Sequence, residues 1–330
     1  MRALSPIEKW SYALGNVPYA VKDTAFGTFV VFYYTQVMGL SGTLSGLAMM
    51  IALVWDAVSD PLVGSWSDSL RTRWGRRHPP MLVGAIPTCL LFLLLFGPPM
   101  ELSQGALFAW LLVVSILLRT FLTLYFIPYQ AMGAELSVDY DERTVIAKAR
   151  VTVAWLGGLS LPAIAYSMIF QAEGELDGRL VYDNYSDYGL LSFLLAAVTA
   201  AVCLWGTRRA IPNLPQPRGE RRRFSVRSTV EDFTRAARNA NFRKTIGTKL
   251  AFGISAGTYT TMGLYMGTYF WEFSSDQLAG LIAPMMLATL SVFVILNRLG
   301  QRFDKPSLMS GACLVFGLNS LWFIGLRLLD

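Results

Sequence analysis

Charged residues are scarce in this chain. Asp, Glu, Lys and Arg make up only 15% of its 330 residues, whereas soluble domains carry about 25%. There is one histidine, His78, and the three cysteines, Cys89, Cys203 and Cys313, form no C-x-x-C pair. The low charge argues against a soluble enzyme or a disordered chain. The few histidines and cysteines exclude a histidine-based proton relay, a His/Cys metal site and a disulfide framework.

Hydrophobic residues are abundant instead, at 54% of the chain. They fall into runs of about 20 residues, which is long enough for a helix to cross the ~30 Å hydrocarbon core of a bilayer. The sequence therefore predicts an all-α membrane protein with nine spans. They cover 12–34, 42–66, 80–99, 104–133, 146–170, 188–207, 245–270, 277–297 and 308–328.

The placement of basic residues predicts the orientation of these spans. With the N-terminus in the cytoplasm, Arg179 and Arg327 alone among the Lys and Arg residues fall on the outer side, and Lys22, Arg119 and Lys249 fall within spans. Every other Lys and Arg is then cytoplasmic, as the positive-inside rule requires. We expect an integral protein of a bacterial inner (plasma) membrane with a cytoplasmic N-terminus.

The long basic loop 208–244 divides the chain. We expect a six-helix N-terminal half at 1–207, a cytoplasmic linker with a short surface helix at 225–239, and a partial C-terminal half of three helices at 245–330. The linker is either a solvated basic segment or a site for anionic lipid. The layout is typical of a transporter built from two six-helix halves. About three helices of the second half are missing if this pattern holds.

Two carboxylates lie inside the second span, where charges are costly. Asp56, Ser59 and Asp60 share one helix face because they are three and four residues apart. Pro61 has no N–H, so it leaves the Ala57 carbonyl without its helical partner. Such an all-oxygen site suits Na⁺ or a proton. The alternative is a structural ion pair with Lys22 or Arg119.

Three cations also lie within spans. Arg119 is either the charge partner of the two aspartates or a residue that extends toward the membrane surface, and the sequence leaves both open. It shares a helical stripe with Thr123, Phe126 and Gln130. Lys249 lies near the start of its span, so we expect it to reach the cytoplasmic surface.

The loop after the second span, GSWSDSLRTRWGRR at 64–77, resembles the G-x3-D…R-x-G-R-R signature of the major facilitator superfamily. The resemblance implies a cytoplasmic gate in which an acid and several arginines tie helix ends together. A weaker copy follows the eighth span at 299–305. The gate residues implied are Gly64, Asp68, Arg73, Gly75, Arg76 and Arg77.

Three further stretches resemble the glycoside–pentoside–hexuronide:cation symporters, of which the melibiose permease is the best-known member. They are Lys22-Asp23, the segment WDAVSDP at 55–61, and IPYQAMGAELSVDYDERT at 127–144. This resemblance covers essentially the whole chain and is strongest in the first half. It implies a major facilitator fold with a central cavity, alternating access, and cotransport of a sugar with Na⁺, Li⁺ or H⁺.

The same resemblance implies roles for individual residues. Asp56, Asp60, Ser59 and Thr123 match the cation site, with Ser59 in place of an asparagine. Asp23 and Arg150 match sugar-binding residues. The chain departs from the permease at Phe126, which replaces a sugar-binding aspartate, and at Gln130, which replaces a tryptophan. The expected substrate-binding residues are Asp23, Phe126, Tyr129, Gln130 and Arg150, with Lys22 and Arg119 as charge partners.

These observations predict a secondary active transporter, a sugar or glycoside:cation symporter, and not an enzyme. We expect a small-molecule substrate, contact with membrane lipid, no nucleic acid, and no cofactor apart from the coupling ion. A truncated or non-transporting relative and a transporter of lysolipid or another organic solute remain open. A membrane prenyltransferase with Asp183 and Asp187 as its second acidic motif is a remote alternative, because topology places that motif outside.

Overall fold

The computed structural model describes residues 4–172, 176–213, 231, 234–299, 303, 307–308 and 310–318. Within these residues the chain is built from helices and contains no β-strand, so the all-α prediction is confirmed. The surface helix expected at 225–239 and the second motif at 299–305 lie largely outside the described residues.

Five helices in the described part of the chain are long and apolar enough to cross a membrane. They coincide with the second to sixth predicted spans and support an integral membrane protein. These helices are α4 (Gly42–Ser69), α5 (His78–Phe96), α6 (Gln104–Glu135), α7 (Tyr140–Ile164), which continues into η3 (Ala165–Ile169), and α8 (Tyr182–Thr207).

The first predicted span is a chain of short helical segments instead of one regular helix. A capping box between Ser5 and Glu8 starts it, and Gly15 ends its first segment. Two π-helical turns follow further on, each widening the helix by one residue. The segments are α1 (Pro6–Leu14), α2 (Val17–Thr24), η1 (Ala25–Phe29), α3 (Val30–Phe32) and η2 (Tyr33–Val37).

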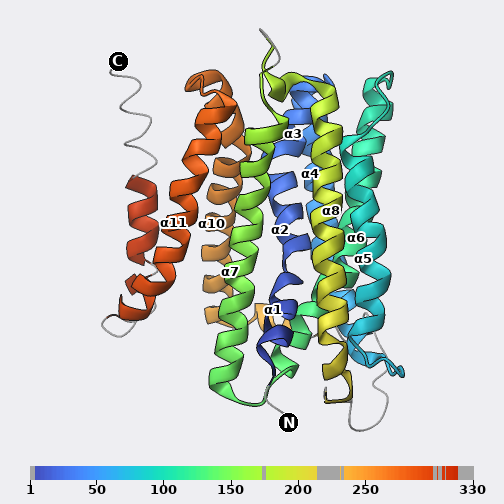
Figure 1. Ribbon diagram of the computed structural model, residues 1–330, viewed down its shortest axis with the longest axis vertical. Coiled ribbons are helices and arrows are strands. Elements are labelled where there is room, and N and C mark those ends of the chain that lie inside the picture. The colour runs from blue at the N-terminus through green and yellow to red at the C-terminus, as the bar shows by residue number, and fades with distance from the viewer. Residues whose placement is uncertain are drawn as a thin grey trace. The chain divides into compact units, whose positions relative to one another are not determined.

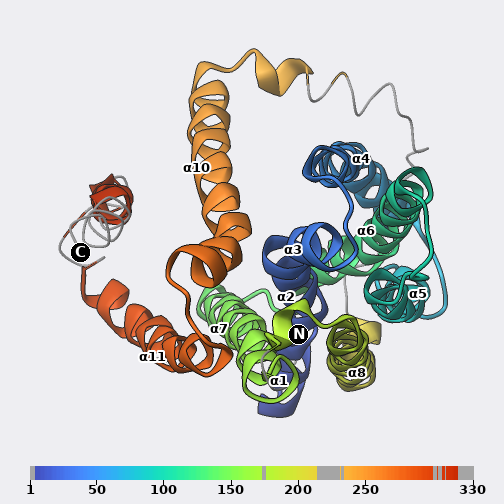
Figure 2. The same ribbon diagram turned by 90° about the horizontal axis from the view of Figure 1, so that it is seen from above.

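This segmented helix lies among the other helices. Figures 1 and 2 show α1 and α2 between α7 and α8, and both segments contact both of those helices. Many of its side chains are accordingly buried: Tyr12, Val21, Phe29 and Tyr33 are almost completely inaccessible. The segment α2 therefore presents most of its residues to the interior of the bundle.

Helix α6 packs between α4 and α5 (Figure 2). Its approach to α5 is close enough to require glycine, because a Cβ atom at Gly84 would lie 2.5 Å from the Phe121 carbonyl oxygen. On its other side α6 contacts α4. This packing brings the polar stripe of α6 opposite the two aspartates of α4.

Aromatic side chains fill the bundle at the end opposite the N-terminus. The Phe29 ring lies 4.5 Å from that of Tyr188, and the Tyr33 ring stacks on Tyr185 at 4.3 Å. The hydroxyl of Tyr34 donates to the Leu95 carbonyl at 2.8 Å. These contacts tie the segmented helix to α5 and α8 at this end.

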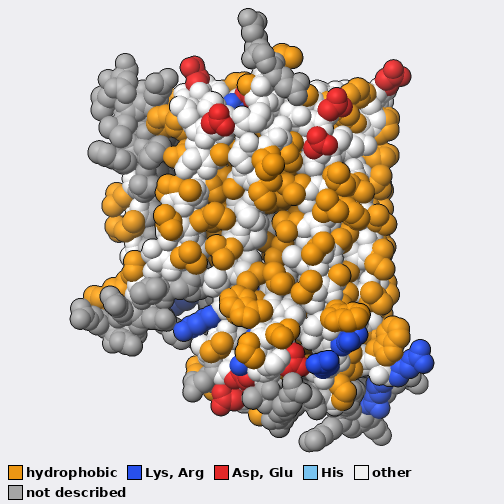
Figure 3. All heavy atoms as spheres, in the orientation of Figure 1, with side chains coloured by type: hydrophobic (Ala, Val, Ile, Leu, Met, Phe, Trp, Pro, Cys, Tyr) orange, Lys and Arg blue, Asp and Glu red, His pale blue; other side chains and the backbone are white. Residues whose placement is uncertain are grey.

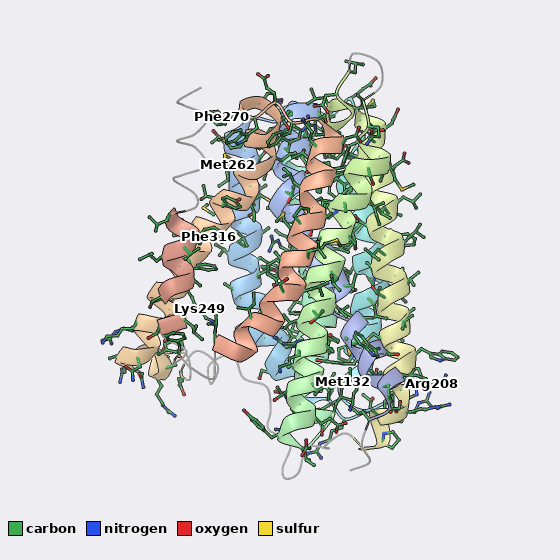
Figure 4. The ribbon with its side chains drawn as sticks, turned by 60° about the vertical axis from the view of Figure 1, so that its left-hand side comes forward. Met132, Arg208, Lys249, Met262, Phe270 and Phe316 are labelled. Carbon is green, nitrogen blue, oxygen red and sulfur yellow. The ribbon has the colours of Figure 1, made fainter. Side chains whose placement is uncertain are left out.

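Helix α10 (Ala240–Tyr265), extended by η6 (Met266–Phe270), packs on the segmented helix through η1 and α3. The Tyr265 ring meets Phe32 at 5.1 Å, and the Tyr269 hydroxyl donates to the Gln36 side-chain oxygen at 2.8 Å. Figure 4 shows Met262 and Phe270 toward this end and Lys249 toward the other. Apolar side chains of the Lys249 half, including Leu250 and Ile254, are exposed.

The chain divides into two compact units, Met1–Gly280 and Leu281–Asp330. Helix α11 (Ser275–Leu299) begins in the first and ends in the second, and residues 310–318 of the second unit are helical. The predicted division into an N-terminal half at 1–207, a linker at 208–244 and a partial C-terminal half at 245–330 stays a prediction, because this boundary does not test it.

On the face of the first unit that Figure 3 shows, the charged side chains lie mainly near the ends of the helices. Figure 3 shows hydrophobic side chains across the middle of this face, with Lys and Arg mainly toward the end that carries the N-terminus. Arg208, which points away from the bundle in Figure 4, belongs to that end. This distribution is typical of a helical bundle that crosses a bilayer.

Candidate functional site: a charged pocket between α2, α4 and α6

A cavity of about 270 Å³ opens between α2, α4 and α6. Helix α4 contributes the two predicted carboxylates, and α6 contributes its polar stripe. The cavity therefore gathers residues from three separate stretches of the sequence. Its lining residues are Tyr19, Lys22, Asp56, Asp60, Arg119, Leu122, Thr123, Phe126, Ile127 and Gln130.

Arg119 forms an ion pair with Asp56 across the cavity. The arginine is 5% exposed, and its guanidinium lies over the Phe26 ring at 4.6 Å. Arg119 is therefore paired with an aspartate and does not extend toward the membrane surface, which was the other role that the sequence left open. The pairing removes part of the repulsion between the two aspartates.

Asp60 has a neutral partner. The Thr123 hydroxyl donates to Asp60 Oδ1 at 2.8 Å, so α4 and α6 are joined at this level by both a hydrogen bond and an ion pair. Ser59 is buried, and its hydroxyl contacts the Asp56 carbonyl oxygen at 3.5 Å. Ser59 is not among the residues that line the cavity.

Lys22 lies at the wall formed by α2. Its ammonium pairs with Asp23 at 2.6 Å and lies over the Tyr19 ring at 4.2 Å. Tyr19 in turn stacks on Phe126 of α6 at 4.0 Å. The α2 side of the cavity thus combines a cation with a pair of stacked rings. The sequence did not single out Tyr19 as a site residue, because aromatic residues are common throughout the chain.

The expected substrate-binding residues do not all meet at this cavity. Phe126 and Gln130 line the cavity, and Asp23 forms an ion pair with Lys22, which also lines it. Tyr129 points elsewhere: it is fully buried, stacks on Tyr12 at 4.7 Å and donates to the Tyr12 carbonyl at 2.9 Å. Arg150 is not a lining residue, and its carbonyl accepts a hydrogen bond from Asn16 at 3.3 Å.

The residues can supply oxygen ligands for a cation. The Asp56 Oδ1 atom is buried and has no hydrogen-bond partner among the described residues, which is an arrangement that a bound cation would satisfy. No group of three His, Cys, Asp or Glu side chains suited to a metal ion occurs in the part of the chain that the structure describes. The carboxylates of Asp56 and Asp60, the hydroxyls of Thr123 and Tyr19 and the amide oxygen of Gln130 belong to residues that line the cavity, and the two carboxylates are the anionic ligands among them.

A second cluster joins helix ends at the loop between α4 and α5. Arg77 pairs with Asp68 at 2.7 Å and with Glu135, the last residue of α6. Arg76 pairs with Glu135 as well, at 2.6 Å. The structure therefore brings Asp68, Arg76 and Arg77 of the predicted gate together and adds Glu135. Glu135 lies in the stretch 127–144 that resembles the symporter family, but the sequence alone predicted no partner for it.

The loop itself depends on backbone geometry. Gly75 has φ of +73°, a left-handed conformation that favours glycine, and its carbonyl accepts a hydrogen bond from the Thr72 hydroxyl at 2.6 Å. Arg73 lies over the Trp74 ring at 5.4 Å. Gly64 lies in α4, where a Cβ atom would meet Ile127 at an ordinary contact distance of 3.6 Å.

The chain is similar to several transporters. It is 28% identical over 326 residues to a putative glycoside/cation symporter of Escherichia coli, an alignment that covers 97% of this chain and 67% of that one. It is 29% identical over 164 residues to the isoprimeverose transporter of Lactiplantibacillus pentosus, covering 48% and 34% of the two chains. It is 33% identical over 188 residues to sodium-dependent lysophosphatidylcholine symporter 1-A of Danio rerio, covering 56% and 35%.

The chain thus spans about a third to two thirds of the length of these relatives. The matched relatives are named as transporters, which fits the helical bundle and its charged cavity. A family model described as MFS/sugar transport protein matches residues 11–325, and the chain belongs to this family.

Proposed function

We propose that the chain acts as a secondary active transporter that carries a sugar or glycoside together with Na⁺ or H⁺ by alternating access. The observation that carries this proposal is the shared cavity. Asp56, Asp60 and Thr123 offer oxygen ligands in the same 270 Å³ space that Phe126 and Gln130 line. A cation and a small solute bound there would be neighbours, so each can change the affinity for the other.

The cation would be held between α4 and α6. Asp60 and Thr123 are already joined across these helices, so a bound cation adds attraction at the same place. The repulsion between Asp56 and Asp60 that the Arg119 ion pair leaves in place falls when a cation binds. We infer that this draws α4 and α6 together and orders the wall made by Tyr19 and Phe126.

The substrate would lie against the α2 side of the cavity. The stacked rings of Tyr19 and Phe126 offer an apolar surface, Gln130 offers amide hydrogen bonds, and Lys22 with Asp23 offers charged partners. Sugars present both apolar C–H faces and hydroxyl groups, which fits this combination. Arg150 and Tyr129 lie outside the lining, so their assignment to the substrate rests on the family resemblance alone.

Lysolipid is a second candidate substrate. The zebrafish relative is named for lysophosphatidylcholine and sodium, and the lining cations Lys22 and Arg119 could meet a phosphate. Phe126, which stands where the melibiose permease has an acid, removes a negative charge that would repel such a headgroup.

The proposal extends to topology and gating. We propose that the N-terminal end, with Arg71 to Arg77 and Arg208, faces the cytoplasm. The ion pairs of Arg76 and Arg77 with Asp68 and Glu135 then hold the cytoplasmic ends of α4, α5 and α6 together when the transporter is closed on that side.

The test is uptake by proteoliposomes that contain the full chain. We expect accumulation of labelled glycosides only under an inward Na⁺ or H⁺ gradient, and its collapse with an ionophore. Accumulation of lysophosphatidylcholine instead would select the second candidate. Uptake of neither class under any gradient would contradict the proposed transport by this chain.

A further inference from the structure

The four charged residues that line the cavity are not equivalently paired. Arg119 pairs with Asp56, and Lys22 pairs with Asp23. Asp60 forms no ion pair with any residue that the structure describes, and its partner is the Thr123 hydroxyl at 2.8 Å. Formal charges therefore cancel throughout the cavity except at Asp60.

Arg119 is held by few contacts. Its guanidinium has one carboxylate oxygen of Asp56 and the ring of Phe26, while its Nε atom is buried without a hydrogen-bond partner in the described part of the chain. The Asp56 Oδ1 atom is unpartnered as well. A buried guanidinium can make five donor contacts, so this pair is incompletely satisfied.

We propose that Arg119 is a tethered cation that occupies Asp56, which leaves Asp60, with its partner Thr123, as the carboxylate of this pair that is open to the coupling ion. Arg119 is then a specificity-determining residue, and Asp56 and Asp60 have different roles. This inference rests on the proposed cation coupling and assigns its regulation to one residue.

Removing the guanidinium should strengthen cation binding. Without Arg119, two unpaired carboxylates one helical turn apart face the cavity. An additional charge within about 4–6 Å changes a binding equilibrium by about one to three powers of ten. We therefore expect Arg119→Gln to tighten Na⁺ binding at least about tenfold. Asp56→Asn should weaken it, because the freed and buried Arg119 then turns toward Asp60.

The double variant makes the prediction sharper. Asp56→Asn combined with Arg119→Gln removes both charges of the pair and leaves Asp60 and Thr123 unchanged. Neutral replacement of both partners of a buried ion pair is often tolerated by the fold. Its Na⁺ response should therefore return to that of the wild-type chain, and it should exceed that of Asp56→Asn alone.

The experiment is a titration of the purified full chain with NaCl and LiCl at fixed pH and ionic strength, followed by tryptophan fluorescence. Trp55 is a built-in reporter, because its indole N–H donates to the Thr120 hydroxyl at 2.7 Å. Trp55 directly precedes Asp56 in the sequence, and Thr120 directly follows Arg119. Arg208→Gln is the matched control, since Arg208 is an exposed arginine at a helix end that stacks on Trp205. Arg119→Lys, which keeps the positive charge, should change Na⁺ affinity less than Arg119→Gln does.

The variants separate this inference from the proposed function. A Na⁺ affinity in Arg119→Gln that is unchanged or weaker, or a double variant that binds no better than Asp56→Asn, would overturn the role of Arg119. If Arg119→Gln does not fold, the comparison of the double variant with Asp56→Asn still decides. A full Na⁺ response in Asp60→Asn would instead overturn the proposed cation site itself.

Discussion

Arg77 illustrates how one residue can join several helices. It is 3% exposed and contacts Asp68, Glu135 and the Ser67 hydroxyl. Burial alone would lower the pKa of the Arg77 guanidinium, but hydrogen bonds and attraction from Glu135, followed by Asp68, raise its pKa above the ordinary value. The guanidinium therefore stays charged at this helix junction.

Arg77→Gln should destabilise the chain. It leaves the Glu135 carboxylate, which is itself mostly buried, with Arg76 as its remaining ion-pair partner among the described residues. Loss of one partner from a buried pair costs about 3–5 kcal/mol, so the unfolding temperature in detergent should fall clearly. Arg73→Gln is the control, since Arg73 is exposed and lies over Trp74. Equal unfolding temperatures for the two variants would contradict the assigned role of Arg77.

The two glycines of the same motif should respond differently to alanine. Gly75 has φ of +73°, where an alanine costs about 1–2 kcal/mol. Gly64 lies inside α4 with room for a Cβ atom, where alanine is favoured over glycine by about 0.5–1 kcal/mol. Thermal unfolding should therefore show Gly75→Ala less stable and Gly64→Ala no less stable than the wild type. The reverse order would show that the loop does not need this conformation.

At the level of helices, the contact between α5 and α6 sets the position of the polar stripe on α6. A Cβ atom at Gly84 would meet the Tyr125 backbone nitrogen at 2.6 Å and the Phe121 carbonyl oxygen at 2.5 Å. Backbone atoms cannot move aside as a flexible side chain does. The two helices would have to separate to admit any larger residue.

Gly84→Ala should therefore cost about 1–3 kcal/mol in stability, as overpacking of a close contact does. It should also weaken cation binding, because a displaced α6 carries Thr123 away from Asp60. Gly105→Ala on the partner helix α6 is the control, since nothing lies within 4 Å of a Cβ atom there. Differential scanning fluorimetry and a Na⁺ titration of both variants check this. An unchanged Gly84→Ala protein would show that the close approach is not required.

The sequence predicted the helices well because runs of apolar residues are long and continuous. Spans expected at 42–66 and 104–133 correspond to Gly42–Ser69 and Gln104–Glu135. The segmentation of the first helix was not predicted. Its π-helical turns η1 and η2 contact α10, α4 and α8, and apolar periodicity carries no signal for such turns.

The sequence predicted part of the candidate site, because residues spaced three or four apart share one face of a helix. Helical spacing placed Asp56 and Asp60 on one face of α4 and Arg119 and Thr123 on one stripe of α6, and both sets line the cavity. Spacing within a helix does not fix how two helices rotate against each other. The choice of Asp56 over Asp60 by Arg119, the burial of Tyr129, and the pairing of Glu135 with two arginines therefore required the structure.

At the scale of the whole molecule, the distribution of charge predicts which end faces the cytoplasm. Arg71 lies in the loop between α4 and α5, and Asp183 lies in the first turn of α8. In a background without Cys313, a cysteine at Asp183 should react with a membrane-impermeant maleimide added to intact cells. A cysteine at Arg71 should react only after the cells are opened. Labelling of Arg71→Cys from outside would contradict the proposed topology.

The central claim is that Asp60, held by Thr123, couples the cation to the substrate. The direct measurement is the Na⁺ or H⁺ dependence of glycoside binding and uptake by the full chain with Asp60→Asn, alongside Asp187→Asn, an exposed aspartate of α8. We predict that Asp60→Asn abolishes cation stimulation and leaves some cation-independent binding, while Asp187→Asn behaves as the wild type. Full cation stimulation in Asp60→Asn would contradict the account and make the pair of aspartates purely structural.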